Sequence, residues 1–127
     1  MKYLIISITT VSLLIGSWLI FFSYSSKDLD TYTQFLEDEV LPAVEAEHWD
    51  ESSRLMKKLD DDWHKYKKTA LLFLDTQTIN EIDYSLARAE KYVKSEDVSN
   101  SSGELNSMIE QLTFLKQNDE VTFANIL

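Results

Sequence analysis

The sequence contains no cysteine, only two glycines and a single proline. Without cysteine the chain can form no disulfide, no thiolate metal site and no thiol nucleophile, and it cannot carry a lipid on a cysteine. The scarcity of glycine argues against phosphate-binding loops and against most tight turns, because both depend on the backbone freedom of glycine. With few turn formers and many Leu, Glu, Lys and Asp residues, the composition favours helices joined by short connections.

Basic side chains are also scarce, since 12 Lys and Arg stand against 22 Asp and Glu and give a net charge of -10. A polyanionic nucleic acid would be repelled by such a surface, so we predict no nucleic-acid partner. The length of 127 residues suits one domain with an anchor.

A long apolar run follows Met1 and Lys2 and carries no charge before Lys27. Residues 3–22 would form a helix about 30 Å long, which matches the thickness of a bilayer core. Twelve of these residues are Leu, Ile, Val or Phe, and at roughly -0.3 to -0.6 kcal/mol each they favour insertion by about 4–7 kcal/mol. We therefore predict that residues 1–27 are a membrane anchor that contacts membrane lipid through residues 3–22.

The alternative for this run is a cleaved signal peptide, with Ser23 and Ser25 before the cut, which would make a secreted helical protein. The run is longer than the roughly 7–15 apolar residues of a signal peptide, and this favours the uncleaved anchor. Lys2 and the terminal amine then place the N-terminus in the cytoplasm. The prediction is a single-pass protein of the cell membrane, with residues 28–127 as an extracytoplasmic domain.

The predicted domain carries all 22 acidic but only ten basic side chains, a net charge of -12. Repulsion should hold such a domain away from an anionic membrane surface. This argues against a lipid-binding face on the domain.

Apolar residues recur at helical spacing in four stretches after the anchor. These stretches cover residues 28–47, 50–70, about 78–94 and 104 onward. Each has one apolar face that must be buried against the others. The predicted fold is therefore all-α, with an N-terminal transmembrane helix followed by an antiparallel array of four amphipathic helices.

Several boundaries of these helices can be predicted. Pro42 predicts a kink or a break near residues 38–41, because proline removes a helical hydrogen bond. The third helix can be capped by Thr78 with Glu81 or by Asp75 instead. The apolar residues 71–74 either continue the second helix or cross beneath the bundle.

The end of the chain is predicted as one loop and one helix. Residues 95–103 are rich in Ser, Asp and Asn and are predicted to be a loop. The fourth helix then begins at a capping box formed by Ser101 and Glu104. The tail has apolar residues at Phe123, Ile126 and Leu127, which we expect to dock on the core.

Residues 48–68, HWDESSRLMKKLDDDWHKYKK, contain both histidines and two of the three tryptophans of the chain. Asp60 and His64 have the spacing of two metal ligands on a helix, and His48 could in principle join them. A tight site needs three or four ligands in a fixed geometry, and no third ligand is specified here. Trp63 instead falls on an apolar stripe within about 80° of arc, together with four other residues. Those residues are Leu55, Leu59, Tyr66 and Ala70.

Four short motifs resemble a small bacterial family of membrane-anchored, all-helical proteins known as a domain of unknown function. They are EHWDES around Trp49, DDDWHKYKK around Trp63, LARAEKYV at residues 86–93 and the closing NIL at residues 125–127. The resemblance covers nearly the whole chain and supports the anchored helical fold. Where the family often has an aspartate-histidine pair, this chain has Asp-Thr at residues 75–76.

Three classes of function remain to be compared. The sequence has no ordered Ser, His and Asp, no clustered ligands and no glycine loop, so we predict no enzyme, no cofactor, and no catalytic, cofactor-binding or metal-binding residues. One hypothesis is an interaction or accessory subunit of another integral membrane protein, reached through small residues of the anchor. Those residues are Ser7, Thr10, Gly16 and Ser17. The alternative is an extracytoplasmic ligand-sensing helical domain.

Overall fold

The computed structural model describes the backbone of residues 1–126 and the side chains of residues 1–118. Within this part the chain forms helices and no strands, which confirms the predicted all-α class. The elements are α1 (Lys2–Phe35), the π-helical turn η1 (Leu36–Val40), α2 (Leu41–Glu45), α3 (Trp49–Ala70), α4 (Thr76–Lys94) and α5 (Val98–Ile126).

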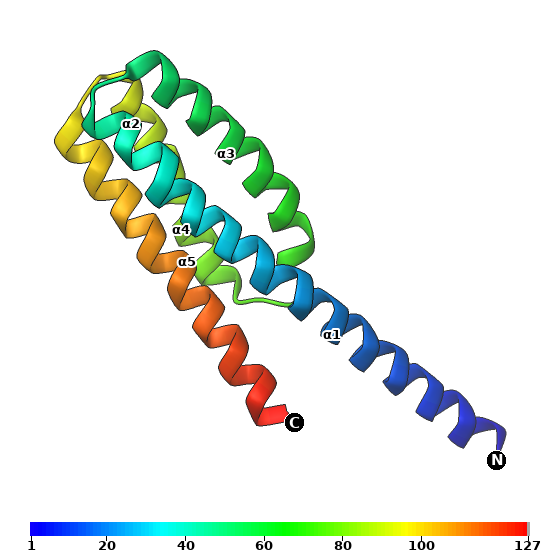
Figure 1. Ribbon diagram of the computed structural model, residues 1–127. Coiled ribbons are helices and arrows are strands. Elements are labelled where there is room, and N and C mark those ends of the chain that lie inside the picture. The colour runs from blue at the N-terminus through cyan, green and yellow to red at the C-terminus, as the bar shows by residue number, and fades with distance from the viewer. Residues whose placement is uncertain (127) are drawn as a thin grey trace.

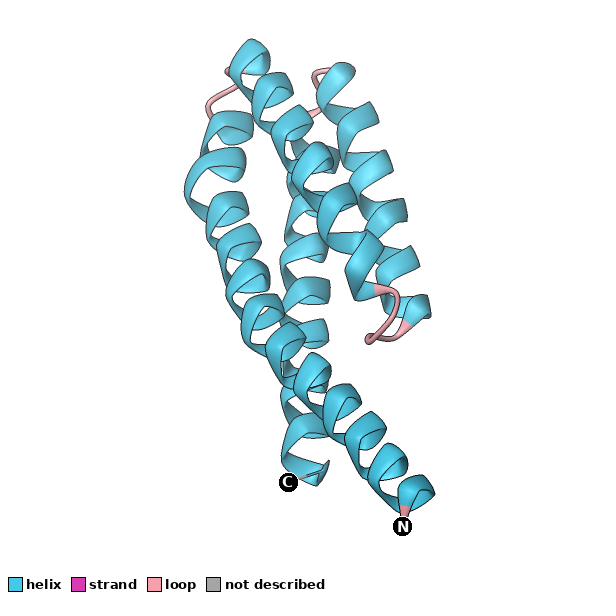
Figure 2. Cartoon of the chain, turned by 90° about the vertical axis from the view of Figure 1, so that its right-hand side faces the viewer, coloured by secondary structure: helices cyan, strands magenta, loops and turns pink. Residues whose placement is uncertain are grey.

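Helices α1, η1 and α2 form one continuous rod of 44 residues. The chain reverses direction at each of the three connections that follow, so that this rod, α3, α4 and α5 lie side by side and alternate in direction (Figure 1). The first half of α1 projects out of the bundle (Figure 2), and the last turns of α5 diverge from it (Figure 1).

The buried core confirms the predicted apolar stripes. In α3, the five stripe residues are all buried, and Trp63 is only 1 % exposed. Helices α4 and α5 bury the same kind of stripe, which includes Ile79, Ile82, Leu105 and Met108. Because each stripe repeats every three or four residues, each helix turns one face to the bundle and leaves charged residues outside.

The projecting part of α1 is apolar and exposed. Among residues 1–126, the rod Lys2–Glu45 is the one helix long and apolar enough to cross a membrane, by length and composition. Packing of α1 against the bundle begins at Phe21, whose ring stacks on that of Phe73 with 4.5 Å between the ring centroids. One turn later Ser25 Oγ lies 2.6 Å from the hydroxyl of Tyr66. The predicted division of the chain at residue 27 stays a prediction.

Pro42 does not break the first rod. The irregularity predicted near residues 38–41 is present as the π-helical turn η1, in which the amide of Leu41 donates to the carbonyl of Leu36. A π-helical turn widens the helix by one residue. The wider turn lets the rod continue past a residue that lacks an amide hydrogen.

Two of the connections turn tightly without glycine. Glu47 and Glu96 follow α2 and α4 and adopt the left-handed φ values of 58° and 56°. After Glu47, His48 N donates to Ala43 O at 2.9 Å, the long bond of a Schellman motif. The glycine-poor composition therefore still allows tight turns, because a glutamate takes the position where glycine is most frequent.

Side-chain caps decide where α4 and α5 begin. Asp75 accepts a hydrogen bond from the amide of Thr78, so the Asp75 alternative for the start of α4 is the correct one. Asp97 accepts from the amide of Asn100 at 3.1 Å, and α5 begins at Val98. The predicted loop over residues 95–103 is therefore wrong beyond residue 97. Ser101 does not start the helix but is fully buried within it.

The side chains of Phe123 and Ile126, and Leu127 as a whole, lie outside the described residues. The predicted docking of this tail on the core stays a prediction.

Candidate functional site

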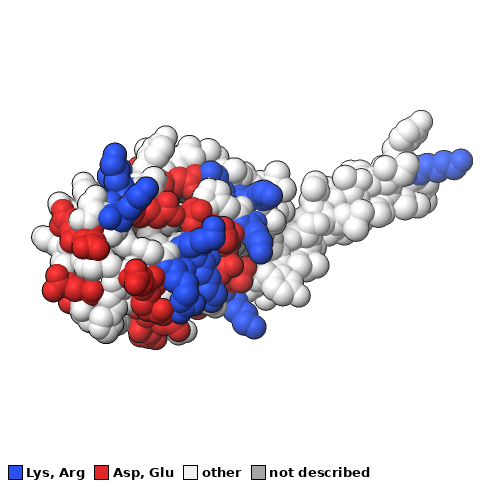
Figure 3. Space-filling model, turned by 90° about the horizontal axis from the view of Figure 1, so that it is seen from above, with Lys and Arg blue, Asp and Glu red and all other residues white. Residues whose placement is uncertain are grey.

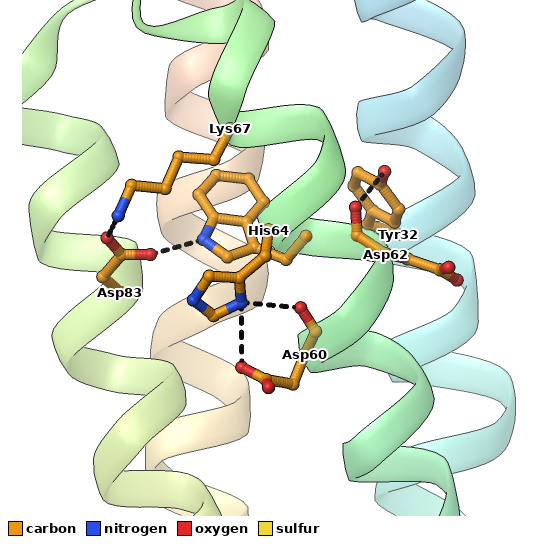
Figure 4. Close-up of polar contacts among 7 residues, drawn as sticks. Tyr32, Asp60, Asp62, His64, Lys67 and Asp83 are labelled. Carbon is orange, nitrogen blue, oxygen red and sulfur yellow. Dashed lines mark hydrogen bonds and ion pairs between the residues drawn. The ribbon is translucent and has the colours of Figure 1, made fainter.

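Residues 48–68 divide between buried and exposed positions, and Figure 4 shows polar contacts in the second half of the segment. The indole nitrogen of Trp63 donates to Asp83 Oδ1 of α4 at 2.6 Å. Lys67 forms an ion pair with the other carboxylate oxygen of Asp83. Asp83 thus holds two residues one turn apart on α3, which fixes the register between α3 and α4. This network of contacts has a structural role. The sequence predicted that Trp63 is buried, but it did not indicate Asp83 as the partner of Trp63.

The two residues with metal-ligand spacing do meet. His64 Nδ1 lies 3.1 Å from Asp60 Oδ1, and it also contacts the backbone oxygen of Asp60 at 2.8 Å. His48 lies just before the first residue of α3, sixteen positions away, which is about 24 Å along a helix. His48 therefore cannot join the pair. No group of three His, Cys, Asp or Glu residues suited to a metal ion occurs in the part of the chain that the structure describes.

A neighbour that sequence reasoning missed is Glu90, which reaches the pair from α4. Burial raises the pKa of Glu90 above its ordinary value of 4.5, as do the negative charge of Asp60 and a hydrogen bond with it, while His64 acts in the opposite direction. No sequence signal could have found this contact, because it depends on how α4 packs on α3.

Replacing Glu90 by glutamine should raise the melting temperature at pH 7 and leave it nearly unchanged at pH 4. Because the pKa of Glu90 is higher in the folded state, its contribution to stability is fully present below pH 4.5 and is lost as the pH rises through the folded pKa. Thermal unfolding from pH 4 to pH 7 measures this difference. The same change at the exposed Glu110 is the matched control, and an equal response of both variants would contradict the prediction.

A second feature is a groove of about 490 Å³ between α1 and α3, close to where α1 leaves the bundle. Its walls combine aromatic, acidic and basic side chains from both helices. Among them are Tyr24, Asp28 and Tyr32 of α1 and Asp62, Lys65 and Tyr66 of α3. None of the residues singled out in the sequence as possible ligands lines it.

Tyr32 lines the groove. Its hydroxyl donates to the backbone oxygen of Asp62 at 3.2 Å, and its ring meets that of Trp63 edge-on, with 6.4 Å between the ring centroids. Burial, with the charges of Asp28 and Asp62, raises the pKa of Tyr32 to about 12. Tyr32 therefore stays neutral and acts as a hydrogen-bond donor. Tyrosine rings beside carboxylates suit the binding of a polar or cationic segment.

The match with known proteins covers the bundle. The family described as "Domain of unknown function (DUF4363)" matches residues 20–126. The chain belongs to the DUF4363 family. The match begins next to Phe21, where α1 starts to pack on the bundle, and it confirms the resemblance seen in the sequence. No curated protein and no solved structure matches the chain.

Proposed function

We propose that this protein is a membrane-anchored, extracytoplasmic helical subunit that binds another integral membrane protein. The proposal includes no catalytic step. The observation that supports it is that one face of α1 extends from the apolar part of the helix to the groove between α1 and α3.

The shared face follows from the helical repeat. At 100° per residue, four residues fall within about 100° of arc on α1. They are Gly16 and Ser17 in the apolar part, and Tyr24 and Thr31 in the wall of the groove. Because α1 runs without interruption from Lys2 to Phe35, these residues form one continuous surface. A partner helix packed on Gly16 would emerge from the bilayer beside the groove.

Gly16 is suited to a close approach. A Cβ atom built on Gly16 would meet nothing within 4 Å in this chain, so packing inside the protein does not require a glycine there. Small residues let the backbones of membrane helices approach closely. Glycine adds little apolar surface to a helix that inserts into a bilayer. Close packing of a partner helix would explain why a glycine stands at this position.

The test is affinity purification of the tagged full-length protein from gently solubilised native membranes, followed by mass spectrometry. We expect one membrane protein in near-equal amount, and a loss of about fivefold or more in its recovery when Gly16 and Ser17 are replaced by leucine. Ser7→Leu, which lies outside the shared face, is the matched control and should leave recovery unchanged.

A second candidate function is ligand sensing, which the groove itself favours. A small polar or cationic ligand bound between Tyr32 and Asp62 would contact the same helix that crosses the membrane. Recovery of the protein alone under several detergents would contradict the accessory role. Ligand screening against the intact protein would then address the groove directly.

A further inference from the structure

The connection between α3 and α4, residues 71–74, exposes large apolar side chains and is here named the basal turn. Leu72 is 77 % exposed and Leu71 is 38 % exposed, whereas Phe73 and Leu74 pack partly against the core. The exposed surface of these two adjacent leucines contributes nothing to the core. They are expected where a surface meets an apolar environment.

The basal turn lies at the end of the bundle from which α1 leaves (Figure 1). The rings of Phe21 and Phe73 stack with 4.5 Å between their centroids. This contact places the basal turn beside Phe21 of α1. Phe21 belongs to residues 3–22, the stretch predicted to contact lipid. A bilayer that accommodates this stretch therefore reaches the level of the basal turn.

Three lysines near the same end form no ion pair within the described part of the chain. Lys65 and Lys68 belong to the last turns of α3, and Lys27 lies six residues after Phe21. Basic side chains gather where the bundle meets the uncharged projecting helix (Figure 3). Carboxylates near them in the sequence, among them Asp28, Asp62 and Asp75, partly offset their charge.

The two remaining lysines near this end have acidic partners. Lys67 pairs with Asp83, and Lys116 Nζ lies 2.7 Å from Asp30 Oδ1. The end of the bundle from which α1 leaves therefore carries less negative charge than the net charge of the domain indicates. The repulsion expected from that net charge acts mainly on the far end.

We propose that the basal turn enters the interface of the same bilayer that α1 crosses, so that the bundle rests on the membrane at a second point. Leu71 and Leu72 bury apolar surface among the acyl chains, and the lysines around them reach anionic headgroups. Helix α1 then tethers the bundle to the membrane, and the second contact fixes the tilt of the bundle relative to the membrane plane. This inference rests on the membrane anchoring included in the proposed function.

The test uses the full-length protein in lipid nanodiscs that contain doxyl-labelled lipids. Because the chain has no cysteine, the single substitutions Leu72→Cys, Ile8→Cys and Ser99→Cys each give one unique position for an environment-sensitive fluorophore. Ile8 reports on the crossing helix, and Ser99 lies in the first turn of α5, next to the connection at the far end of the bundle.

We expect a shallow doxyl group to quench the label at Leu72 at least twofold more than the label at Ser99, and a deep doxyl group to quench the label at Ile8. A quenched Ile8 with equal quenching at Leu72 and Ser99 would overturn the inference and leave the anchor intact. An unquenched Ile8 would overturn the anchor itself. Quenching at Leu72 should increase in discs rich in phosphatidylglycerol, and equal quenching in phosphatidylcholine would overturn the role of the lysines.

Discussion

Replacing Trp63 by alanine is expected to lower the free energy of unfolding by about 3–5 kcal/mol, the usual cost of removing a buried aromatic ring. Trp63 is 1 % exposed, and its ring lies 5.5 Å from that of Tyr66 between centroids. The substitution also removes the donor to Asp83 Oδ1. Since α1, α3 and α4 all meet at this ring through Tyr32, Tyr66 and Asp83, the surrounding helices cannot easily close the cavity.

The measurement is chemical unfolding of the detergent-solubilised protein, followed by circular dichroism. Trp63→Phe separates much of the two contributions, because it keeps a buried six-membered ring and removes the pyrrole ring with its hydrogen-bond donor. It should cost about 1–2 kcal/mol. Trp49→Ala, at the partly exposed start of α3, should cost less than Trp63→Ala. A loss below about 1 kcal/mol for Trp63→Ala would refute the structural role assigned to this residue.

Placing two arginines in the apolar part of α1, at Val11 and Leu14, is expected to release the protein from membranes. Each arginine near the centre of a crossing helix costs about 2.5–3.5 kcal/mol. Together they cost about 5–7 kcal/mol, which cancels the roughly 4–7 kcal/mol that the twelve large apolar residues provide. Carbonate extraction of membranes, with immunodetection in pellet and supernatant, measures the release.

The matched control adds the same charge to exposed positions of the bundle, Ser99→Arg with Ala87→Arg, and should remain in the pellet. Retention of the Val11→Arg, Leu14→Arg variant would contradict a single crossing helix. The mass of the native chain tests the signal-peptide alternative, because cleavage after Ser25 would shorten the protein and release it without any substitution.

The helices themselves could be predicted because their information is local. The stripe from Leu55 to Ala70 repeats at the helical period and is buried as a unit. The cap at Asp75 is likewise contained within a few residues of sequence. The loop over residues 95–103 was mispredicted because small polar residues suit both a loop and a close helix contact. Only the packing of α5 on its neighbours shows that Ser101 is buried.

The sequence by itself determined the class of the fold, the apolar run of residues 3–22 and the buried faces of the helices, since each depends on composition or on a period along one helix. Only the tertiary structure decided which residues meet across helices. In the folded protein Glu90 contacts Asp60, Asp83 accepts a hydrogen bond from Trp63, and Phe21 stacks on Phe73. The tertiary structure also made the apolar run and the first bundle helix one rod. The physical reason is that contacts between helices depend on their relative rotation and register, which no local pattern specifies.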